Sequence, residues 1–347
     1  MNFRPPLLLD SQDVAHLLDY PSCIDAVEEA FRRYGRRETE PPTVCGVHLE
    51  EGGFHVKAAV LHTSRRYFAA KTNANFPGNP ERHGLPTIQG IVLLFDAACG
   101  APLAVMDSGE ITVRRTAAAT AVAARHLARP DASRLTLCGC GVQGRAQLEA
   151  LCQVLPIKQI FAYDADPAAA ERLVEEMAGF LQVNIVVVRE LRASARGSDV
   201  CVTCTPSSQY LLGPNDVQPG SFVAGVGADS PEKRELAPEL LAGSRLVVDI
   251  LEQCAAMGDL HHALAAGALT RESVHAELGE VVAGRKPGRT ADEQVFVFDS
   301  TGTALQDVAA AALVYERARQ AGRGLEFAVD RRARREPPRS GPPAQHP

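Results

Sequence analysis

The segment Leu135-Thr-Leu-Cys-Gly139-Cys-Gly141-Val142-Gln143-Gly144 decides the fold. A short strand-forming run leads into a complete G-x-G-x-x-G, and a helical pattern begins at Gln143. The first glycine permits a tight turn, the second lets the backbone approach a pyrophosphate, and the third lets the helix pack closely on the strand. The N-terminus of that helix also offers free N–H groups to the phosphates. In this context the motif predicts that Gly139, Gly141, Val142, Gln143 and Gly144 bind a dinucleotide; the alternative is a glycine-rich turn in another kind of α/β protein.

Asp164 supports a dinucleotide site, because it stands at the end of the next strand, 25 residues after Gly139. An acid at about this distance binds the ribose 2′-hydroxyl of NAD in such folds. A carboxylate there would repel the 2′-phosphate of NADP, and the following Ala165-Asp166 offers no arginine to neutralise one. NAD(H) is therefore the expected cofactor. The alternative is that Asp164 only caps the helix before Pro167.

The regions on either side of the glycine motif differ in their periodicity. After residue 134, apolar runs alternate with helical stretches, which predicts a doubly wound parallel sheet, the Rossmann type of α/β fold. Between residues 44 and 105, short apolar runs follow one another without long helices, which predicts an antiparallel sheet. The expected strands of the parallel sheet are 135–138, 159–163, 183–188, 199–205, 222–226, 246–250 and 295–298. The expected strands of the antiparallel sheet are 54–60, 67–70, 88–95 and 102–105. The main expected helices are 11–36 (with a break near Pro21), 112–128, 143–154, 167–181 and 304–320.

Length and composition exclude several classes of protein. A chain of 347 residues suggests two domains, and a net charge of −6 gives no sign of a nucleic-acid or membrane partner. No signal peptide or apolar run of about 18 residues is present, so a cytoplasmic location is expected. The nine cysteines are scattered, and the two close pairs, Cys138/Cys140 and Cys201/Cys204, lack further ligands at metal-binding spacing. No metal is therefore expected, and these two pairs are assigned to the core. Residues 331–347, rich in Arg and Pro, are predicted to be a disordered tail.

Thr205-Pro206-Ser207 ends the expected strand 199–205 at the carboxyl edge of the parallel sheet. Ligands bind at this edge in doubly wound folds. Thr205 therefore either lines the nicotinamide side of a cleft or, with Pro206, only ends the strand.

Further motifs occur in a fixed order along the chain: Ala70-Lys71, Asn75-Phe-Pro-Gly-Asn79, Thr112-Val-Arg-Arg115-Thr, Gly227-Ala-Asp229 and Asp299-Ser300-Thr301-Gly302. Together with the glycine motif they resemble the ornithine cyclodeaminase/mu-crystallin family, most closely its alanine-dehydrogenase-like members, over about residues 10–328. The resemblance implies a Rossmann NAD-binding domain at residues 126–303. It also implies an α+β domain for substrate binding and dimerisation, built from both chain ends (1–125 and 304–330). A homodimer is therefore expected.

The resemblance also implies roles for single residues. Lys71 and Arg115 would hold the carboxylate of the substrate, with Lys71 close to the reacting atoms. Asp229 would be the general acid/base at the amino or imino nitrogen, with Lys233 either as its partner or merely as a surface charge. Taken alone, Lys71 would be a solvated strand end, Arg115 a helix-surface residue and Asp229 an Asx-turn or a helix cap before Pro231. The residues expected to approach the nicotinamide or the substrate are Val226, Ser300 and Thr301.

One departure from the family pattern affects the expected substrate. Members often carry a basic residue just after the first proline pair, where this chain has Pro41-Pro42-Thr-Val-Cys45. Lys57 could take over part of that carboxylate contact, and ornithine in particular becomes doubtful. The expected activity is an NAD-dependent dehydrogenase or ketimine reductase of small amino or imino acids. The alternatives are ornithine cyclodeamination and a non-catalytic NAD(P)H-binding protein of the mu-crystallin kind.

Overall fold

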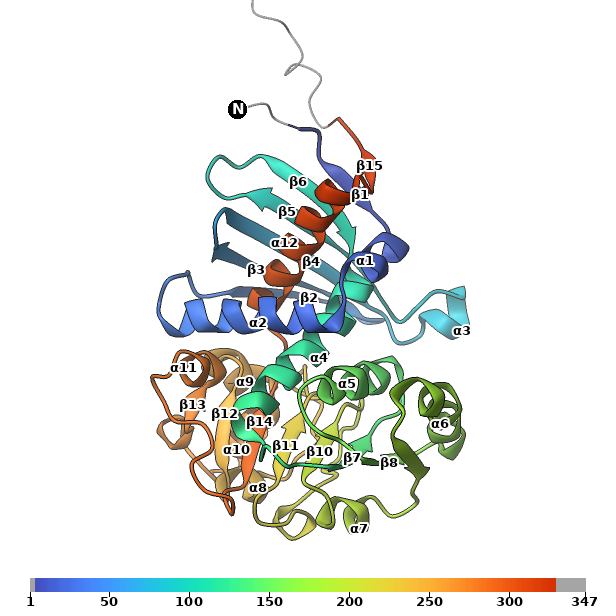
Figure 1. Cartoon of the computed structure of the whole chain (residues 1–347), viewed down its shortest axis with the longest axis vertical. Helices are drawn as coiled ribbons and strands as arrows, with labels where there is room; N and C mark the ends of the chain where they lie inside the picture. The colour runs from blue at the N-terminus through green and yellow to red at the C-terminus, as the bar shows by residue number, and fades with distance from the viewer. Residues whose placement is uncertain (1–3, 329–347) are drawn as a thin grey trace, which may run out of the picture.

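The computed structural model describes residues 4–328 and has two lobes, each built on one β-sheet (Figure 1). The upper sheet is antiparallel except that β1 runs parallel to β6. The antiparallel sheet predicted for residues 44–105 is therefore confirmed. In spatial order its strands are β15 (Leu325–Glu326), β1 (Leu7–Leu9), β6 (Pro102–Asp107), β5 (Ile88–Asp96), β4 (Arg66–Asn75), β3 (Gly53–His62) and β2 (Thr43–His48).

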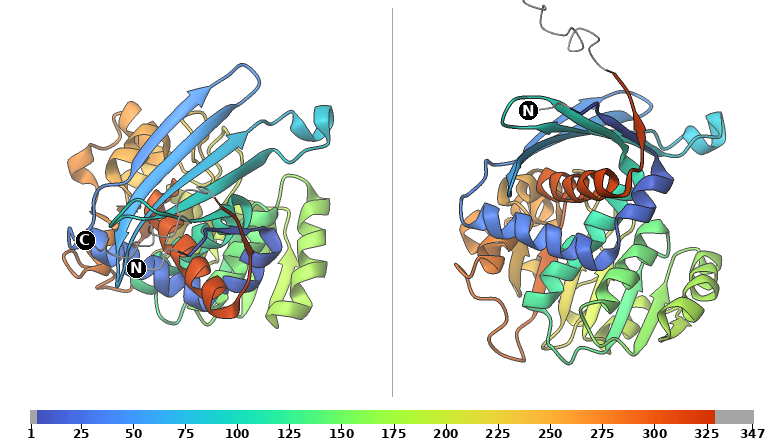
Figure 2. Two further views of the ribbon diagram at one scale, coloured as in Figure 1. Left: turned by 90° about the horizontal axis from the view of Figure 1, so that it is seen from above. Right: turned by 45° about the horizontal axis from the view of Figure 1, so that its top comes forward.

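One face of the upper sheet packs on helices, as Figure 2 shows in its right-hand view. The strands alternate accordingly: Tyr67, Ala69 and Lys71 of β4 point inward and are buried. Helix α12 (Ala304–Ala321) lies across β3 and β4, and α2 (Tyr20–Gly35) packs beside it. Helix α1 (Ser11–Leu17) precedes α2, and a short α3 (Asn79–His83) leads to β5.

The break expected near Pro21 lies slightly earlier in the chain. Helix α1 ends at Leu17, and the Asp19 side chain caps α2 by accepting from the N–H of Ser22 at 2.9 Å. Pro21 then stands in the first turn of α2, where its missing N–H removes no helical hydrogen bond.

The lower sheet is entirely parallel, which confirms the predicted doubly wound fold. The strand order reverses between β7 and β10, and ligands of such sheets bind at this point, outside the carboxyl edge. In spatial order the strands are β13 (Ala276–Glu277), β12 (Arg245–Val248), β14 (Phe296–Asp299), β11 (Phe222–Gly225), β10 (Val200–Thr203), β7 (Arg134–Cys138), β8 (Gln159–Tyr163) and β9 (Asn184–Val187). The helices are α5 (Val142–Cys152), α6 (Pro167–Leu181), α7 (Leu191–Arg196), α8 (Pro238–Ala242), α9 (Leu251–Met257), α10 (Asp259–Ala265) and α11 (Leu278–Val282).

The chain passes between the lobes twice. The first crossing is α4 (Ser108–Leu127), which runs from the upper to the lower lobe (Figure 1). Its alanine-rich second half is almost wholly buried. The second is the short connection from β14 to α12, residues 300–303. The domain boundaries assigned from the sequence stay a prediction, and the expected tail at 331–347 lies outside the described residues. Within residues 4–328, no helix is long and apolar enough to cross a membrane.

Candidate active site

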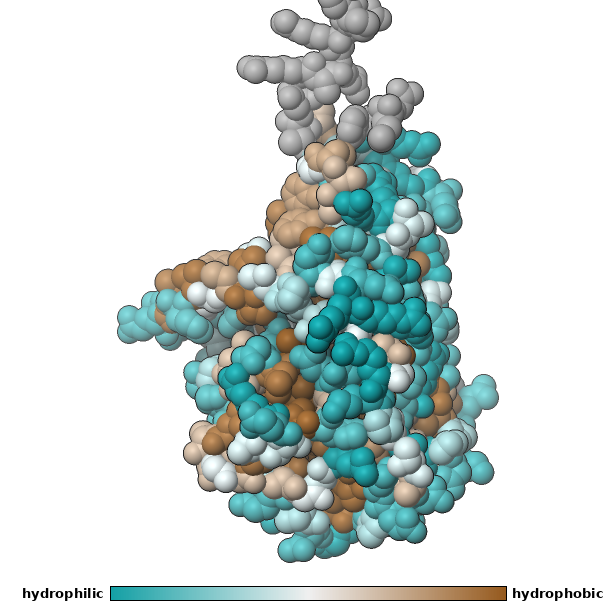
Figure 3. Space-filling view, turned by 90° about the vertical axis from the view of Figure 1, so that its left-hand side faces the viewer, coloured by the Kyte–Doolittle hydropathy of each residue, from teal (hydrophilic) through white to brown (hydrophobic). Residues whose placement is uncertain are grey.

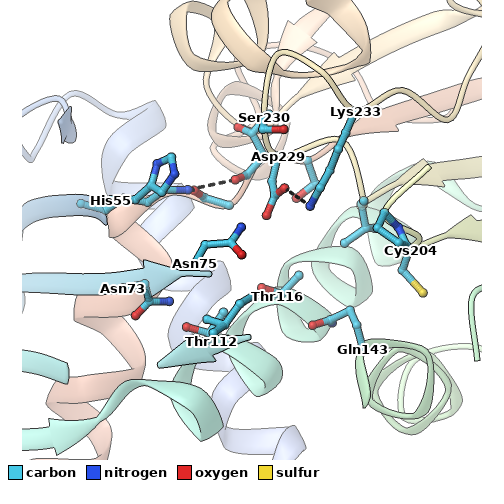
Figure 4. Close-up of a pocket in the computed structure, with 18 of the residues that line it drawn as sticks. His55, Asn73, Asn75, Thr112, Thr116, Gln143, Cys204, Asp229, Ser230 and Lys233 are labelled. Carbon is cyan, nitrogen blue, oxygen red and sulfur yellow. Dashed lines mark hydrogen bonds and ion pairs between the residues drawn. The ribbon is translucent and has the colours of Figure 1, made fainter. Parts of the chain in front are cut away.

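A cavity of about 320 Å³ lies between the two lobes (Figure 4). Residues of β3, β4 and α4 form its upper wall, and the loops that follow β10, β11 and β14 form its lower wall. The predicted site residues that line it are Lys57, Lys71, Arg115, Gln143, Thr205, Val226, Asp229, Lys233, Ser300 and Thr301. Lining residues to which the sequence assigned no role include His55, Asn73, Asn75, Ile88, Thr112, Thr116, Cys204, Ser230 and Gly302.

Three cationic side chains meet on the upper wall. The strand register places Lys57 opposite Lys71 on adjacent strands. The Nζ of Lys57 donates to the carbonyl oxygens of Thr301 at 3.1 Å and Gly302 at 2.6 Å. Lys71 and Arg115 are 3% and 4% exposed, so neither is a solvated surface residue. This part of the wall therefore carries more positive than negative charge and suits an anion.

Asp307 of α12 is the carboxylate that holds two of these cations. Its Oδ1 lies 2.8 Å from Lys71 Nζ and 2.8 Å from Arg115 Nε. Burial alone would raise the pKa of Asp307, but the neighbouring Arg115 and Lys71 outweigh it and hold this pKa below its usual value. Burial, with Arg115 nearby, lowers the pKa of Lys71 to about 7, although Asp307 opposes the shift. No role was assigned to Asp307 from the sequence.

Unused hydrogen-bonding capacity surrounds this charge cluster. Among residues 4–328, the buried polar atoms without a hydrogen-bond partner include Asp307 Oδ2, Gln306 Nε2 and Ser300 Oγ. Gly302 has φ +74°, and a Cβ added there would stand 2.4 Å from Arg115 NH1. The glycine therefore leaves room for the guanidinium, and the cluster retains donors and acceptors for a bound group.

Asp229 enters the cavity from the opposite wall, in the loop that follows β11 (Figure 4). Its Oδ1 is 2.7 Å from Lys233 Nζ, as expected from the resemblance, and its side chain is 51% exposed. The alternative of a helix cap before Pro231 is wrong, because the next helix begins at Pro238. Asp229 therefore lines the same cavity as the three cations, from the opposite lobe.

Glu235 fixes the two loops that form the lower wall. Its buried carboxylate accepts from Thr205 N at 2.7 Å, Thr205 Oγ1 at 2.8 Å, Thr203 Oγ1 at 2.8 Å and Gly227 N at 2.7 Å. The Thr205 hydroxyl is thus engaged in holding the loop, while the residue also lines the cavity. Cys138, Cys140 and Cys201 are buried as predicted, whereas Cys204 is only partly buried and reaches the cavity wall.

The glycine turn lies beyond Gln143, outside the cavity, and its shape fits a pyrophosphate. Gly139 has φ +104°, and a Cβ added at Gly144 would stand 2.2 Å from Gly139 O. A Cβ at Gly141 would meet no atom within 4 Å, so space is open in front of it. Gly141 is also the N-cap of α5 and makes no side-chain capping bond, which leaves the first N–H groups of the helix, beginning at Val142, free for an anion.

Asp164 stands beside the glycine turn. Its Oδ2 accepts from the N–H of Cys140 at 2.7 Å, and its Oδ1 accepts from the N–H of Asp166. The alternative that Asp164 caps the next helix is wrong, because the N-cap of α6 is Asp166, which accepts from the N–H of Ala168. Asp164 is therefore held at the end of β8, next to the turn.

Comparison with known proteins agrees with this geometry. The model of the ornithine cyclodeaminase/mu-crystallin family matches residues 5–322. The chain belongs to this family. A relative from Archaeoglobus fulgidus, called alanine dehydrogenase, is 39% identical over 314 residues, which cover 90% of this chain and 95% of that protein. The family resemblance read from the sequence is thereby confirmed.

Two solved structures of family proteins show the same fold. An archaeal alanine dehydrogenase dimer with bound NAD superposes with a TM-score of 0.89 at 38% identity, covering 94% of this chain and 99% of that one. A Δ1-pyrroline-2-carboxylate reductase of Thermococcus litoralis, in complex with NADH and L-proline, gives a TM-score of 0.86 at 32% identity, covering 92% and 100%. Both lobes are therefore shared with these family members.

Proposed function

We propose that this protein is an NAD(H)-dependent oxidoreductase that moves a hydride to or from the α-carbon of a small amino or imino acid. The observation that carries the proposal is the cavity itself, in which three cations on one wall face Asp229 on the other. An α-amino or α-imino acid has a carboxylate and a nitrogen on the same carbon, and this arrangement offers a partner to each. The alanine dehydrogenase and pyrroline-carboxylate reductase relatives support the same reaction class.

The substrate carboxylate would bind between Lys57, Lys71 and Arg115. A guanidinium can bind a carboxylate through two parallel hydrogen bonds, and the lysines add charge from neighbouring strands. Asp307 keeps Lys71 and Arg115 in place, so little reorganisation is needed when the substrate enters. Holding the substrate still in this way lowers the barrier for a reaction at its α-carbon.

Asp229 would donate or accept the proton at the substrate nitrogen. Lys233 fixes the position of its carboxylate, and the exposed side chain can exchange the proton with solvent. Oxidation of an α-amine gives an imino acid, which water converts into a 2-oxo acid and ammonia. Reduction of a cyclic imine in the same site would be the ketimine reductase reaction.

The dinucleotide would bind along the carboxyl edge of the lower sheet. Gly139, Gly141 and Gly144 would hold the pyrophosphate, and Asp164 the adenosine ribose. At the other end Thr205, Val226, Ser300 and Thr301 would surround the nicotinamide, which supplies or accepts the hydride when bound. The bound NAD and NADH of the two family structures support this assignment.

The test is NADH oxidation followed at 340 nm with pyruvate and ammonia, other 2-oxo acids, and pyrroline- and piperideine-2-carboxylate. Turnover of the open-chain acids identifies an alanine-type dehydrogenase, and turnover of cyclic imines alone a ketimine reductase. An enzyme that binds NADH, is silent with this panel and forms proline from ornithine would instead be a cyclodeaminase. NADH binding without any of these reactions would refute the proposal and leave the non-catalytic alternative.

The proposal extends to a homodimer formed through the outer face of the upper sheet. This face carries exposed apolar side chains, and Figure 3 shows hydrophobic surface along the upper side of the molecule. Apolar patches of this kind mark interaction surfaces. The archaeal relative described as a dimer supports the inference, and the cytoplasmic location stays a prediction. The exposed residues are Leu8, Val47, Phe54, Ile91 and Leu325.

A further inference from the structure

A second cavity of about 560 Å³ adjoins the first. It lies between the inner face of the β2–β3 hairpin and helix α9 of the lower lobe. The two cavities share four lining residues, which are His55, Asn75, Asp229 and Ser230. The shared residues make the second space a continuation of the first at the point where Asp229 stands.

The second cavity lies on the side of the site that is remote from the glycine turn. The turn follows β7, while α9 follows β12, and β10, β11 and β14 lie between these two strands. A dinucleotide whose pyrophosphate lies at Gly141 extends toward the second cavity only with its nicotinamide end. The adenosine lies in the opposite direction, toward Asp164 at the end of β8. The second cavity therefore adjoins the reacting end of the substrate and is not needed for the cofactor.

The orientation of the substrate decides which of its groups enters the second cavity. In the proposed function the substrate carboxylate binds at Lys71 and Arg115, which directs the substrate nitrogen toward Asp229 on the opposite wall. A group attached to that nitrogen extends past Asp229 and Ser230 into the second cavity. We propose that this cavity receives an organic substituent on the substrate nitrogen, so that the enzyme reduces imines formed from a 2-oxo acid and a primary amine larger than ammonia. This inference rests on the proposed function and names its substrate class.

The charges of the second cavity limit the chemistry of that substituent. Its lining includes the carboxylates of Asp229, Glu232 and Glu252, and within the described residues it includes no lysine or arginine. Asp229 and Glu252 pair with Lys233 and Arg271, but neither of these cations is among the lining residues of this cavity. A substituent that is uncharged or positively charged fits this lining, and one that ends in a carboxylate is disfavoured.

The reaction requires only a 2-oxo acid, a primary amine and NADH. The 2-oxo acid and the amine R–NH₂ condense to an imine with loss of water. The α-carbon of the imine then takes a hydride from NADH, and its nitrogen takes a proton through Asp229. The products are NAD⁺ and an N-substituted amino acid, in which the bond from nitrogen to R is unchanged.

The test uses pyruvate, NADH and three amines of similar length: n-propylamine, 1,3-diaminopropane and β-alanine, with ammonia for reference. The rate of NADH oxidation gives kcat/KM for each amine, calculated from the concentration of its free base. Mass spectrometry identifies the N-substituted alanine. We expect turnover with propylamine and diaminopropane at least as efficient as with ammonia, and at least tenfold less efficient turnover with β-alanine. The reverse order between diaminopropane and β-alanine would overturn the assigned charge preference.

A substitution that narrows the second cavity separates its role from that of the first. Ala256 is exposed on α9 and lines the second cavity, so Ala256→Phe reduces its volume without disturbing the core. The kcat/KM for diaminopropane relative to ammonia should fall at least tenfold in this variant. Ala265→Phe, at an exposed position on α10 that lines neither cavity, is the matched control and should leave the ratio unchanged.

The outcomes distinguish this inference from the proposed function. Turnover of pyruvate with ammonia but with none of the larger amines refutes the nitrogen subsite and leaves the proposed function intact. A loss in Ala256→Phe that depends on the size of the 2-oxo acid, and not on the amine, would assign the cavity to the substrate side chain and refute the inference. Absence of any turnover with pyruvate, ammonia and cyclic imines would refute both.

Discussion

Asp307 provides a direct test of the buried charge cluster. Asp307→Asn removes the carboxylate that lies 2.8 Å from both Lys71 Nζ and Arg115 Nε, and leaves the buried Arg115 guanidinium and Lys71 amine without their counter-charge. The side chains of Asp307, Lys71 and Arg115 are 1%, 4% and 5% exposed, so solvent screens them little. Removing one partner of a buried ion pair costs about 3–5 kcal/mol, and we expect a loss in this range. The variant should still fold, since domains of this kind have about 5–15 kcal/mol of stability.

Urea unfolding followed by circular dichroism measures this loss, with and without pyruvate. Asp25→Asn is the control, because Asp25 pairs with Arg125 at the surface with 71% of its side chain exposed. The control should lose less than about 1 kcal/mol. Pyruvate at 100 times its Kd stabilises the wild type by about 2.7 kcal/mol, and it should stabilise Asp307→Asn at least as much, because its carboxylate meets the uncompensated cations. Equal small losses in both variants, or no stabilisation by pyruvate, would refute the assigned carboxylate site.

Four further outcomes are expected. Asp229→Asn should lower kcat by about 10²–10⁴-fold while NADH fluorescence still reports normal binding; unchanged turnover would remove it as the acid/base. The pKa of Lys71 is lowered to about 7, so the cation is lost as the pH rises through that value. The kcat/KM for pyruvate should accordingly fall above about pH 7, and Lys71→Arg should flatten that fall, because arginine stays charged. Asp164→Ala should weaken NADH more than NADPH in fluorescence titrations, and equal losses would contradict the ribose contact. Ile91→Asp, on the outer sheet face, should give a monomer by light scattering, while Val186→Asp, exposed at β9, should not.

The sequence predicted the fold well where a strand or helix has its own periodicity. The seven runs after residue 134 all became strands of the lower sheet, because a strand covered on both faces is a continuous apolar run. The strands β1, β2, β13 and β15 were not predicted, and β13 has only two residues. The burial of β2 shows no alternation, and β1 and β15 have only three and two residues. These strands depend on pairing with partners elsewhere in the chain.

The candidate site was predicted less completely, because its contacts join distant parts of the chain. Lys57 contacts Gly302 across 245 positions, and Lys71 contacts Asp307 across 236. No local pattern marks such pairs, and Asp307 looks like an ordinary acid in the first turn of a helix. The second cavity was not foreseen for the same reason, since its walls come from β2, β3 and α9. Asp229 was singled out through the family resemblance, and Asp164 through its distance of 25 residues from Gly139.

The arrangement of the two lobes separates recognition from chemistry. The groups assigned to the carboxylate belong to the upper sheet and its helices, while Asp229 and the dinucleotide turn belong to the lower sheet. A substitution on β3 or β4 can therefore alter which acid is accepted while the cofactor-binding half keeps its sequence. Both crossings of the chain contribute lining residues to this cavity, with Arg115 on the first and Ser300 on the second. The angle between the lobes thus sets the distance between the groups assigned to the carboxylate and Asp229, so changes in the two crossings, as well as in the cavity walls, can alter the substrate preference.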